Sequence, residues 1–378
     1  MLKGVDEPVA SDLFVCPHCT SVLIHIDETW FCNTCGTVAV QRQNIADFLY
    51  DTQKIELANS GQWDLSEDQR IGLELLELSD GHSYAELGDR AQSLRTNESG
   101  LFDDPHVQLL KSRLALRAQR RFARQYGRVS SEVGRGHGQQ VLHKIEARLR
   151  DLGRPLMPSE LAVELGGGDG QYLLGFAERF DHVLFVDGSL VNVVLARALA
   201  HEDGITNVTF VRADITAVPI RSSVFSMVHA NGVIEHVNDP VALASESVRL
   251  TSADGYSVLI SPNRTPITFE PHFRLPLFGL IPRFIRSPLI AIARGTGSEA
   301  GTDLLSLWRL KRTLQRTDAI WDVFVIPRGI RSTARNTPLR SILARSMQSP
   351  LGAVADKFVN HILLPIAHSH IAIGQRNS

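Results

Sequence analysis

The chain has 378 residues, of which 43% are hydrophobic, which is enough for a large core and comfortable for two domains. No stretch reaches about 18 uninterrupted apolar residues, and the start, MLKGVDEPVA, lacks the basic and apolar regions of a secretory signal. Composition and patterning therefore argue against a membrane-spanning or secreted protein, and they predict a cytoplasmic one.

The formal net charge of -2 hides an uneven distribution. Residues 1–100 carry 6 basic and 17 acidic side chains, whereas residues 261–378 carry 16 basic and 6 acidic ones. The basic C-terminal third is compatible with an anionic substrate, a membrane surface or a nucleic acid. It is equally compatible with a solvated face or with contact to the acidic N-terminal segment, so charge alone does not choose a partner.

All four cysteines lie near the N-terminus, as Cys16, Cys19, Cys32 and Cys35. Two Cys-x2-Cys pairs separated by twelve residues supply four thiolates for a tetrahedral zinc ion. The β-branched run at 22–26 between them favours a strand, which completes a ribbon layout. Redox-active or disulfide pairs are the alternative, and a reducing compartment favours the metal. A closed four-thiolate site is structural, so no catalysis is expected at this zinc.

The ribbon is expected to span residues 1–50, and residues 51–155 are expected to form an acidic linker with accessory helices. Residues 51–100 are polar and acidic with scattered apolar positions, including a cluster at 71–78, which indicates a linker with short helices. Leucines on a rough stripe predict a helix over 107–126, and a second helix is predicted over 139–152.

From residue 160 the chain alternates apolar strands with amphipathic helices. Strands are predicted at 161–165, 182–187, 208–212, 224–230 and 256–261, with helices at 171–180, 190–202 and 240–250. Two later strands, near 321–326 and 370–374, are separated by insertions at 265–318 and 330–366. This alternation predicts an α/β fold with a doubly wound, mostly parallel sheet over residues 156–378.

The first of these strands runs into Glu164-Leu-Gly-Gly-Gly-Asp-Gly170. Glycines at such a turn let the backbone approach a ligand closely, although they also serve tight packing. A dinucleotide fingerprint would need glycine at position 171 or 173, where the chain has Gln171 and Leu173. The nicotinamide interpretation therefore fails on spacing.

Two acids follow at the ends of the next strands. Asp187 ends the second strand, where a carboxylate can accept hydrogen bonds from both hydroxyls of a ribose. Asp214 follows the third strand, in reach of an adenine amine, with Ile215 beside it to pack on the ring. Each acid by itself also fits a strand-end cap or turn residue. Together, at the carboxyl ends of successive strands, they predict one nucleoside-binding crevice.

The segments VELGGGDG, FVDGS, RADI and HANGVIEHVNDP resemble the successive motifs of class I S-adenosylmethionine-dependent methyltransferases, specifically the type 11 group, over about residues 160–263. The resemblance implies a seven-stranded methyltransferase sheet and S-adenosylmethionine as cofactor. It implies as cofactor-binding residues Glu164, Gly166, Gly168 and Gly170 for the methionine part, Asp187 for the ribose, and Asp214 with Ile215 for the adenine. At position 167 the family commonly has cysteine or serine, and this chain has Gly167.

The candidate catalytic residue follows the fourth strand, in Glu235-His236-Val237-Asn238-Asp239. Methyl transfer often needs only a base that removes the acceptor's proton, and an imidazole titrates near neutral pH. The segment resembles the EHV motif of quinone-ring O-methyltransferases, which favours His236 as the base. The alternative is that Glu235 and His236 cap the next helix or line the cofactor floor.

The segment after the strand predicted at 256–261 is a candidate acceptor site. Asn263, His272 and Arg274 are candidate acceptor contacts in a segment that resembles the substrate lid of type 11 enzymes, although prolines and aromatics there also suit a structural role. Residues 275–293 mix apolar residues with arginines, which is compatible with a lipid-like acceptor or peripheral contact with a membrane surface, and too broken to span a bilayer.

The ribbon also resembles a known family. The run FVCPHC to CNTCG, followed by Asn44-Ile-Ala-Asp-Phe48, resembles the zinc ribbon of the transfer-RNA methyltransferase activator subunit. After the cysteines, this chain keeps only the outline of that family's sequence pattern. This resemblance suggests a protein partner that binds through the ribbon.

The leading hypothesis is a methyltransferase for a small-molecule, lipid or sugar acceptor, by O- or N-methylation. One rival is an RNA methyltransferase, since a ribbon also precedes this fold in ribosomal-RNA guanine N1-methyltransferases, and another is a non-catalytic partner-binding protein. The acidity of residues 1–100 gives no strong nucleic-acid signal and favours the small-molecule hypothesis.

Overall fold

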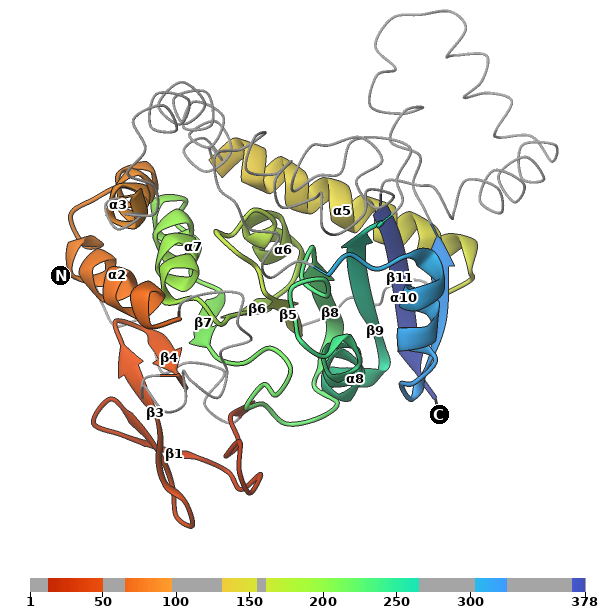
Figure 1. The fold of residues 1–378 in the computed structure, drawn as a ribbon, viewed down its shortest axis with the longest axis horizontal. Helices are drawn as coiled ribbons and strands as arrows, with labels where there is room; N and C mark the ends of the chain where they lie inside the picture. Colours follow the sequence, from red (N-terminus) through yellow and green to blue (C-terminus); the bar gives the residue numbers. More distant parts are fainter. Residues whose placement is uncertain are drawn as a thin grey trace, which may run out of the picture.

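The computed structural model describes residues 13–49, 65–96, 131–154, 161–264, 303–324 and 369–377. Within these ranges eleven strands form one continuous sheet, in the order β1-β2-β3-β4-β7-β6-β5-β8-β9-β11-β10, with helices on both faces (Figure 1). The strands are β1 (Ile24–Ile26), β2 (Thr29–Cys32), β3 (Gly36–Arg42), β4 (Ile45–Asp47), β5 (Leu161–Leu165), β6 (His182–Asp187), β7 (Val208–Arg212), β8 (Phe225–Asn231), β9 (Thr251–Pro262), β10 (Ala319–Phe324) and β11 (Ser369–Arg376). The helices are α2 (Leu65–Leu78), α3 (Tyr84–Thr96), α5 (Ser131–Asp151), α6 (Leu173–Arg179), α7 (Leu190–Glu202), α8 (Pro240–Leu250) and α10 (Leu307–Leu314).

Seven strands, from β5 to β11, make up the predicted methyltransferase-like sheet. Strand β5 lies at the centre and pairs in parallel with β6 and β8, and β7 and β9 continue the parallel pairing outward. Strand β11 runs antiparallel to both β9 and β10. The predicted α/β, mostly parallel arrangement is confirmed for this part of the sheet, with one reversed strand.

Alternating side chains of the central strands build two cores, one on each face of the sheet. In β6, Val183 and Phe185 belong to the core under α5, α6 and α7, whereas Leu184 and Val186 belong to the core under α8 and α10. Because both faces are covered, these strands are apolar at nearly every position, which is why the sequence pattern shows them so clearly.

The cysteine-bearing segment extends this sheet at one edge. Strand β4 pairs in parallel with β7, with Ile45 opposite Phe210, and β3, β2 and β1 follow outward as antiparallel neighbours. A second attachment joins Phe14 to Ile220 in an isolated antiparallel bridge. The ring of Phe14 also lies 4.7 Å from that of Trp30, and both rings belong to a core that includes residues of the parallel strands. The ribbon and the methyltransferase-like strands thus form one continuous sheet and share a core.

A buried arginine ties the ribbon to the parallel sheet. The guanidinium of Arg212, at the end of β7, has no exposed surface. Its Nη1 lies 2.9 Å from Oε1 of Gln69, 3.2 Å from the carbonyl of Leu49 and 3.5 Å from Oδ2 of Asp47. Its Nε donates to the carbonyl of Gly188, 3.2 Å away, in the turn after β6. The side chain of Arg212 therefore connects β4 and α2 with β7 and with the turn after β6.

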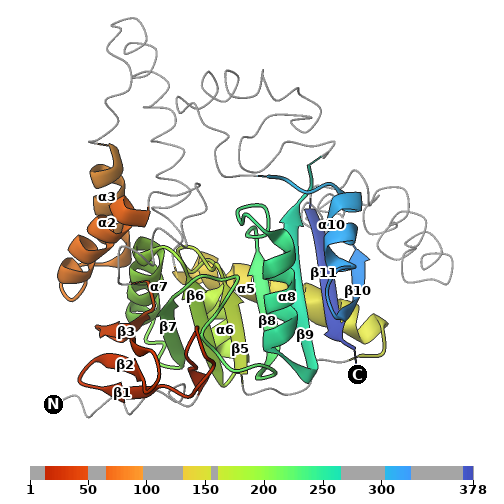
Figure 2. The same cartoon turned by 60° about the horizontal axis from the view of Figure 1, so that its bottom comes forward.

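The acidic segment after the ribbon contributes two helices to the main core. Helices α2 and α3 have 14 and 13 residues and pack on the outer side of α7 (Figure 2). Ile71, Leu75 and Leu87 are fully buried there. The sequence predicts only short helices in a linker, because these apolar positions are dispersed among acids. The residues between the ribbon and α2, and the helix predicted over 107–126, lie outside the described residues.

Helix α5 begins at Ser131, earlier than the predicted start at Gln139. The glycines of its first turns argue against a helix on propensity, but one of them is needed for packing. A Cβ added at Gly138 would lie 2.4 Å from the backbone oxygen of Tyr172 and 2.8 Å from Cα of Gly175, so α5 and α6 approach each other closely there. Strand β9 likewise begins at Thr251 rather than at Tyr256.

Among the described helices, none is long and apolar enough to cross a membrane.

Candidate cofactor and metal sites

The glycine-rich turn after β5 has a left-handed backbone at three of its glycines. Gly166, Gly168 and Gly170 all have positive φ, at +66°, +60° and +88°. A Cβ at Gly166 would lie 2.8 Å from the side chain of Val233, in the turn after β8. The glycine-rich turn is therefore packed directly against the turn that carries His236.

Gly167 is the position at which this chain departs from the family pattern, and its surroundings explain the glycine. A Cβ there would lie 2.2 Å from the ring of Phe185 on β6. Real Cβ atoms do not come so close to another atom, so cysteine or serine would require the ring to move. Glycine at position 167 therefore makes room for the ring of Phe185. The glycines on either side of it keep their positive φ.

Asp187 brings two of the predicted motifs together at the end of β6. Its Oδ2 accepts a hydrogen bond from the backbone N–H of Gly168 at 3.0 Å, and its Oδ1 accepts from the N–H of Ser189 at 2.8 Å. The side-chain amide of Asn192 adds a contact to Oδ1 at 3.3 Å. The carboxylate is thereby fixed between the glycine-rich turn and the start of α7, where the sequence predicts a ribose.

Glu164 is buried at the end of β5 and faces a histidine that sequence reasoning missed. Its Oε1 lies 3.8 Å from Nδ1 of His229, the residue directly opposite it on β8. Burial lowers the pKa of His229 to about 3, so this imidazole is neutral at physiological pH. The ring packs against Phe176, with centroids 4.7 Å apart. The sheet pairing, which the sequence does not encode locally, is the only signal that could have found the pair.

Three buried carboxyl groups converge on the glycine-rich turn. Burial, reinforced by the charges of Asp187 and Asp169, raises the pKa of Glu164 to about 8. Burial also raises the pKa of Asp187 to about 6 and raises that of Asp169. Their ionised forms would be favoured by a cationic ligand, since an opposite charge at short range offsets both burial and mutual repulsion. The electrostatics around the glycine-rich turn therefore favour a ligand that carries positive charge.

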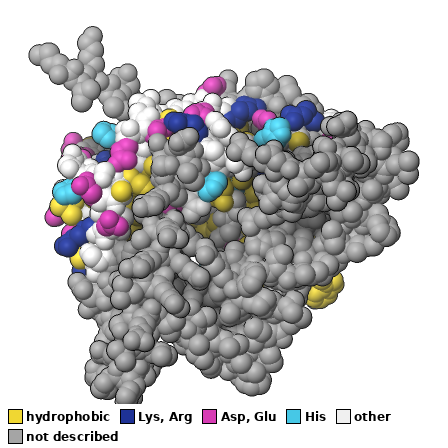
Figure 3. Space-filling view, turned by 90° about the horizontal axis from the view of Figure 1, so that it is seen from above, with side chains coloured by type: hydrophobic (Ala, Val, Ile, Leu, Met, Phe, Trp, Pro, Cys, Tyr) yellow, Lys and Arg dark blue, Asp and Glu magenta, His cyan; other side chains and the backbone are white. Residues whose placement is uncertain are grey.

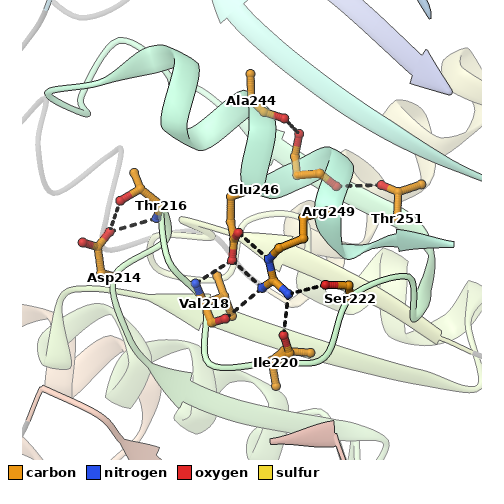
Figure 4. Close-up of polar contacts among 10 residues, drawn as sticks. Asp214, Thr216, Val218, Ile220, Ser222, Ala244, Glu246, Arg249 and Thr251 are labelled. Atoms are coloured by element: carbon orange, nitrogen blue, oxygen red, sulfur yellow. Dashed lines mark hydrogen bonds and ion pairs between the residues drawn. The ribbon is translucent and has the colours of Figure 1, made fainter. Parts of the chain in front are cut away.

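Asp214 and Ile215 lie in the loop that follows β7. One carboxylate oxygen of Asp214 accepts from the backbone N–H of Thr216 at 2.8 Å and from its hydroxyl at 2.7 Å, as a turn residue does (Figure 4). The other oxygen, Oδ2, makes no hydrogen bond to the described residues. Ile215 is half-buried and packs against the core under α8. The turn role of Asp214 is therefore observed, and its role as an adenine acceptor stays a prediction.

The loop that carries Asp214 is fastened to α8. The guanidinium of Arg249 donates to the carbonyls of Ile220 and Val218, at 2.7 and 2.9 Å, and pairs with Glu246 (Figure 4). Glu246 in turn accepts from the N–H of Val218 at 2.7 Å. This cluster holds the loop in place from the side opposite the ribbon.

His236 lies in the turn after β8, half-exposed, and its backbone N–H donates to the carbonyl of Val233 at 2.8 Å. The N-cap of α8 is Asp239, whose Oδ1 accepts from the N–H groups of Val241 and Ala242 at 2.8 and 3.2 Å. The neighbouring Glu235 is fully buried, and its backbone carbonyl accepts from Asp303 at 2.8 Å. Because Asp239 is the side chain that caps α8, the capping alternative for His236 is excluded.

The predicted acceptor contacts are only partly within the described residues. Asn263 follows β9, is fully buried and forms an isolated parallel bridge with Leu305. His272, Arg274 and the apolar 275–293 stretch lie outside the described residues. The predicted acceptor pocket therefore stays a prediction.

The four cysteines gather at one point of the ribbon. Their sulfur atoms all lie within 4.8 Å of one another, and the Sγ atoms of Cys19 and Cys32 are 3.5 Å apart. A zinc ion bonded to four sulfurs at about 2.3 Å separates them by about 3.8 Å, so this spacing fits the metal. After each pair the chain takes a positive φ, +59° at Thr20 and +82° at Gly36.

The thiols cannot all ionise together without a cation. Their contact with one another and burial raise the pKa of Cys35 to about 12, whereas hydrogen bonds with Ser21 lower that of Cys19 to about 6. A divalent metal reverses this repulsion because thiolates are its ligands.

Known proteins match the chain over the segment that carries these motifs. Residues 163–259 match the family described as "Methyltransferase domain". An uncharacterized methyltransferase of Mycolicibacterium vanbaalenii is 32% identical over 97 residues, which are 26% of this chain and 37% of that protein. YcgJ of Bacillus subtilis, also named an uncharacterized methyltransferase, is 25% identical over 122 residues, which are 31% and 48% of the two chains. The matched segments thus span less than half the length of these relatives.

Among solved structures, geranyl diphosphate C-methyltransferase from Streptomyces coelicolor A3(2) aligns with 61% of this chain and 76% of its own, at 17% identity and a TM-score of 0.39. The family match covers the chain from within β5 to within β9, and so includes the glycine-rich turn, Asp187, Asp214 and His236. Residues 163–259 are therefore similar in sequence to a methyltransferase domain.

Proposed function

We propose that this protein is an S-adenosylmethionine-dependent methyltransferase that modifies oxygen or nitrogen of a small-molecule, lipid or sugar acceptor. The observation that carries the proposal is the convergence of Glu164, Asp169 and Asp187 on a positive-φ glycine turn, inside the segment that matches a methyltransferase domain. S-adenosylmethionine carries a sulfonium and an ammonium group, the kind of charge that these buried acids favour.

The predicted contacts divide the cofactor among the loops at the carboxyl ends of the strands. Glu164 and the glycine turn would hold the methionine part, Asp187 the ribose, and Asp214 with Ile215 the adenine. The cofactor supplies the methyl group on its sulfonium. The contribution of the chain is then to orient this group toward an acceptor and to take the acceptor's proton.

His236 is the residue we propose for that proton. Replacing it by alanine should lower turnover by about 10²- to 10⁴-fold, the usual contribution of a positioned base, and leave the dissociation constant of S-adenosylhomocysteine within about twofold of wild type. Turnover is measured with labelled S-adenosylmethionine, and binding by calorimetry. His201→Ala, at an exposed histidine of α7, is the matched control and should change neither quantity.

The acceptor class is tested by a screen with labelled S-adenosylmethionine against phenols, amines, sugars, prenyl compounds and total RNA. Methylation of a small molecule supports the proposal. The RNA alternative predicts labelled RNA and affinity that falls steeply with salt. On the face in Figure 3, acidic, basic and histidine side chains are interspersed among the described residues, which offers no single-sign patch there. RNA methylation with His236→Ala fully active would overturn both the acceptor class and the base.

We also propose that the four cysteines hold a structural zinc ion, and that the ribbon either stabilises the chain or binds a protein partner. The purified protein should contain about one zinc per chain, since four thiolates complete a tetrahedral site. Metal analysis by mass spectrometry measures this content, and a thiol titration should find the cysteines protected until a chelator is added. Metal-free protein with four reactive thiols after mild purification would contradict the assignment.

A further inference from the structure

Two buried side chains of the accessory helices reach the loops of the cofactor crevice. Asp68 of α2 accepts hydrogen bonds from the hydroxyl of Ser189 and from the backbone N–H of Leu190, both at 2.6 Å. Tyr84, at the start of α3, donates its hydroxyl to Oδ2 of Asp169 at 3.0 Å. Both Asp68 and Tyr84 are 4% exposed, so water does not compete for these contacts.

The points of attachment are the two segments that shape the crevice. Ser189 and Leu190 begin α7 immediately after Asp187, and the N–H of Ser189 is itself bonded to that carboxylate. Asp169 lies between Gly168 and Gly170. One accessory helix thus holds the turn after β6, and the other holds the turn after β5.

We propose that Asp68 and Tyr84 are positioning residues of the cofactor site, which fix the turn at 168–170 and the start of α7 in the geometry that receives the ligand. This inference rests on the function proposed above and extends its site into a part of the chain outside the matched methyltransferase domain.

Simple coverage of α7 would not require these polar contacts. Ile71, Leu75 and Leu87 already anchor α2 and α3 by apolar packing, and an exposed Arg90–Glu74 ion pair joins the two helices. A carboxylate in such a core is costly unless its hydrogen bonds are satisfied. Asp68 meets that condition through groups of the cofactor loop, where its charge also stabilises the N-terminus of α7.

Removal of one hydroxyl tests Tyr84. In Tyr84→Phe the dissociation constant of S-adenosylhomocysteine, measured by calorimetry, should rise about five- to tenfold, because one hydrogen bond to a carboxylate no longer fixes the turn. The matched control is Tyr256→Phe, whose hydroxyl bonds to the carbonyl of Arg154 at 3.3 Å, at the amino end of the sheet. Binding by that variant should stay within about twofold of wild type, even where its thermal stability falls.

Asp68→Asn is the second variant and should weaken binding by about tenfold, since the amide replaces one of two acceptor oxygens. Its control is Asp322→Asn, which breaks a pair with Arg148 at 2.8 Å, between β10 and α5. Hydrogen exchange of the peptides that cover 166–170 and 187–190 should accelerate in the two test variants and not in the controls. A purely structural role would lower stability in all four variants without this localised change.

The outcomes separate the two proposals. Wild-type protein that binds S-adenosylhomocysteine, together with Tyr84→Phe and Asp68→Asn variants that bind it equally well, would overturn the positioning role alone. Wild-type protein that binds neither S-adenosylmethionine nor S-adenosylhomocysteine would overturn the proposed function, and the positioning role with it. Should Asp68→Asn fail to fold, Tyr84→Phe decides the matter by itself.

Discussion

Replacing Asp187 by alanine should weaken S-adenosylhomocysteine binding at least about a hundredfold. The change removes the predicted ribose acceptor and also releases the N–H groups of Gly168 and Ser189, which the carboxylate now holds at 3.0 and 2.8 Å. Hydrogen bonds to a charged group contribute about 1.5 to 3 kcal/mol each, so losing those from the two ribose hydroxyls alone weakens binding by more than about a hundredfold. Calorimetric titration of the full chain measures the effect.

The control for this variant is Asp181→Ala, at an exposed aspartate just before β6, at the opposite end of the same strand. It should bind the ligand as wild type does. An Asp187→Ala variant that is folded and keeps wild-type affinity would show that the crevice at the end of β6 does not receive the ribose.

The Asp47→Ala variant should lose about 3 to 5 kcal/mol of the free energy of unfolding. Its carboxylate and Arg212 are both essentially unexposed, and removing one member of a buried pair leaves the other charge without its counter-ion. The expected loss is large because the same guanidinium joins β4, α2 and the turn at Gly188. Urea denaturation followed by far-ultraviolet circular dichroism measures it.

Arg42→Ala provides the comparison, since Arg42 pairs with the same carboxylate at 3.3 Å but is 31% exposed. A partly exposed pair contributes about 1 kcal/mol or less, so this variant should remain close to wild type. Equal losses in the two variants would show that the Arg212–Asp47 pair is not a principal link between the ribbon and the sheet.

The parallel part of the sheet could be predicted because its strands are buried on both faces. Val183 to Val186 form an apolar run bounded by a turn and by Asp187, and such runs need no tertiary information. Helices α2 and α3 were harder to predict from the sequence, because their buried residues are spaced among acidic ones. Only their contact with α7 shows that these residues belong to the core. The pairing of β4 with β7 depends on β7 being the unpaired edge strand of the parallel sheet. The local sequence around β4 does not show which strand that is.

The candidate site divides in the same way. Asp187 and the glycine turn stand at strand ends, where the order of strands alone brings them together. Asp68 and Tyr84 lie 121 and 85 residues before their partners, Ser189 and Asp169, so no spacing rule connects them. The contact of His229 with Glu164 could not be predicted for a similar reason, since it arises only through the pairing of β8 with β5.

The central claim is that the site beside Glu164 and Asp187 binds S-adenosylmethionine. Calorimetric titration of the purified 378-residue chain with S-adenosylmethionine and S-adenosylhomocysteine tests it most directly. The predicted result is one binding site per chain for each ligand. Absence of detectable heat of binding for both ligands up to about 1 mM, at several temperatures, would contradict it, because any remaining affinity would then be weaker than about 4 kcal/mol.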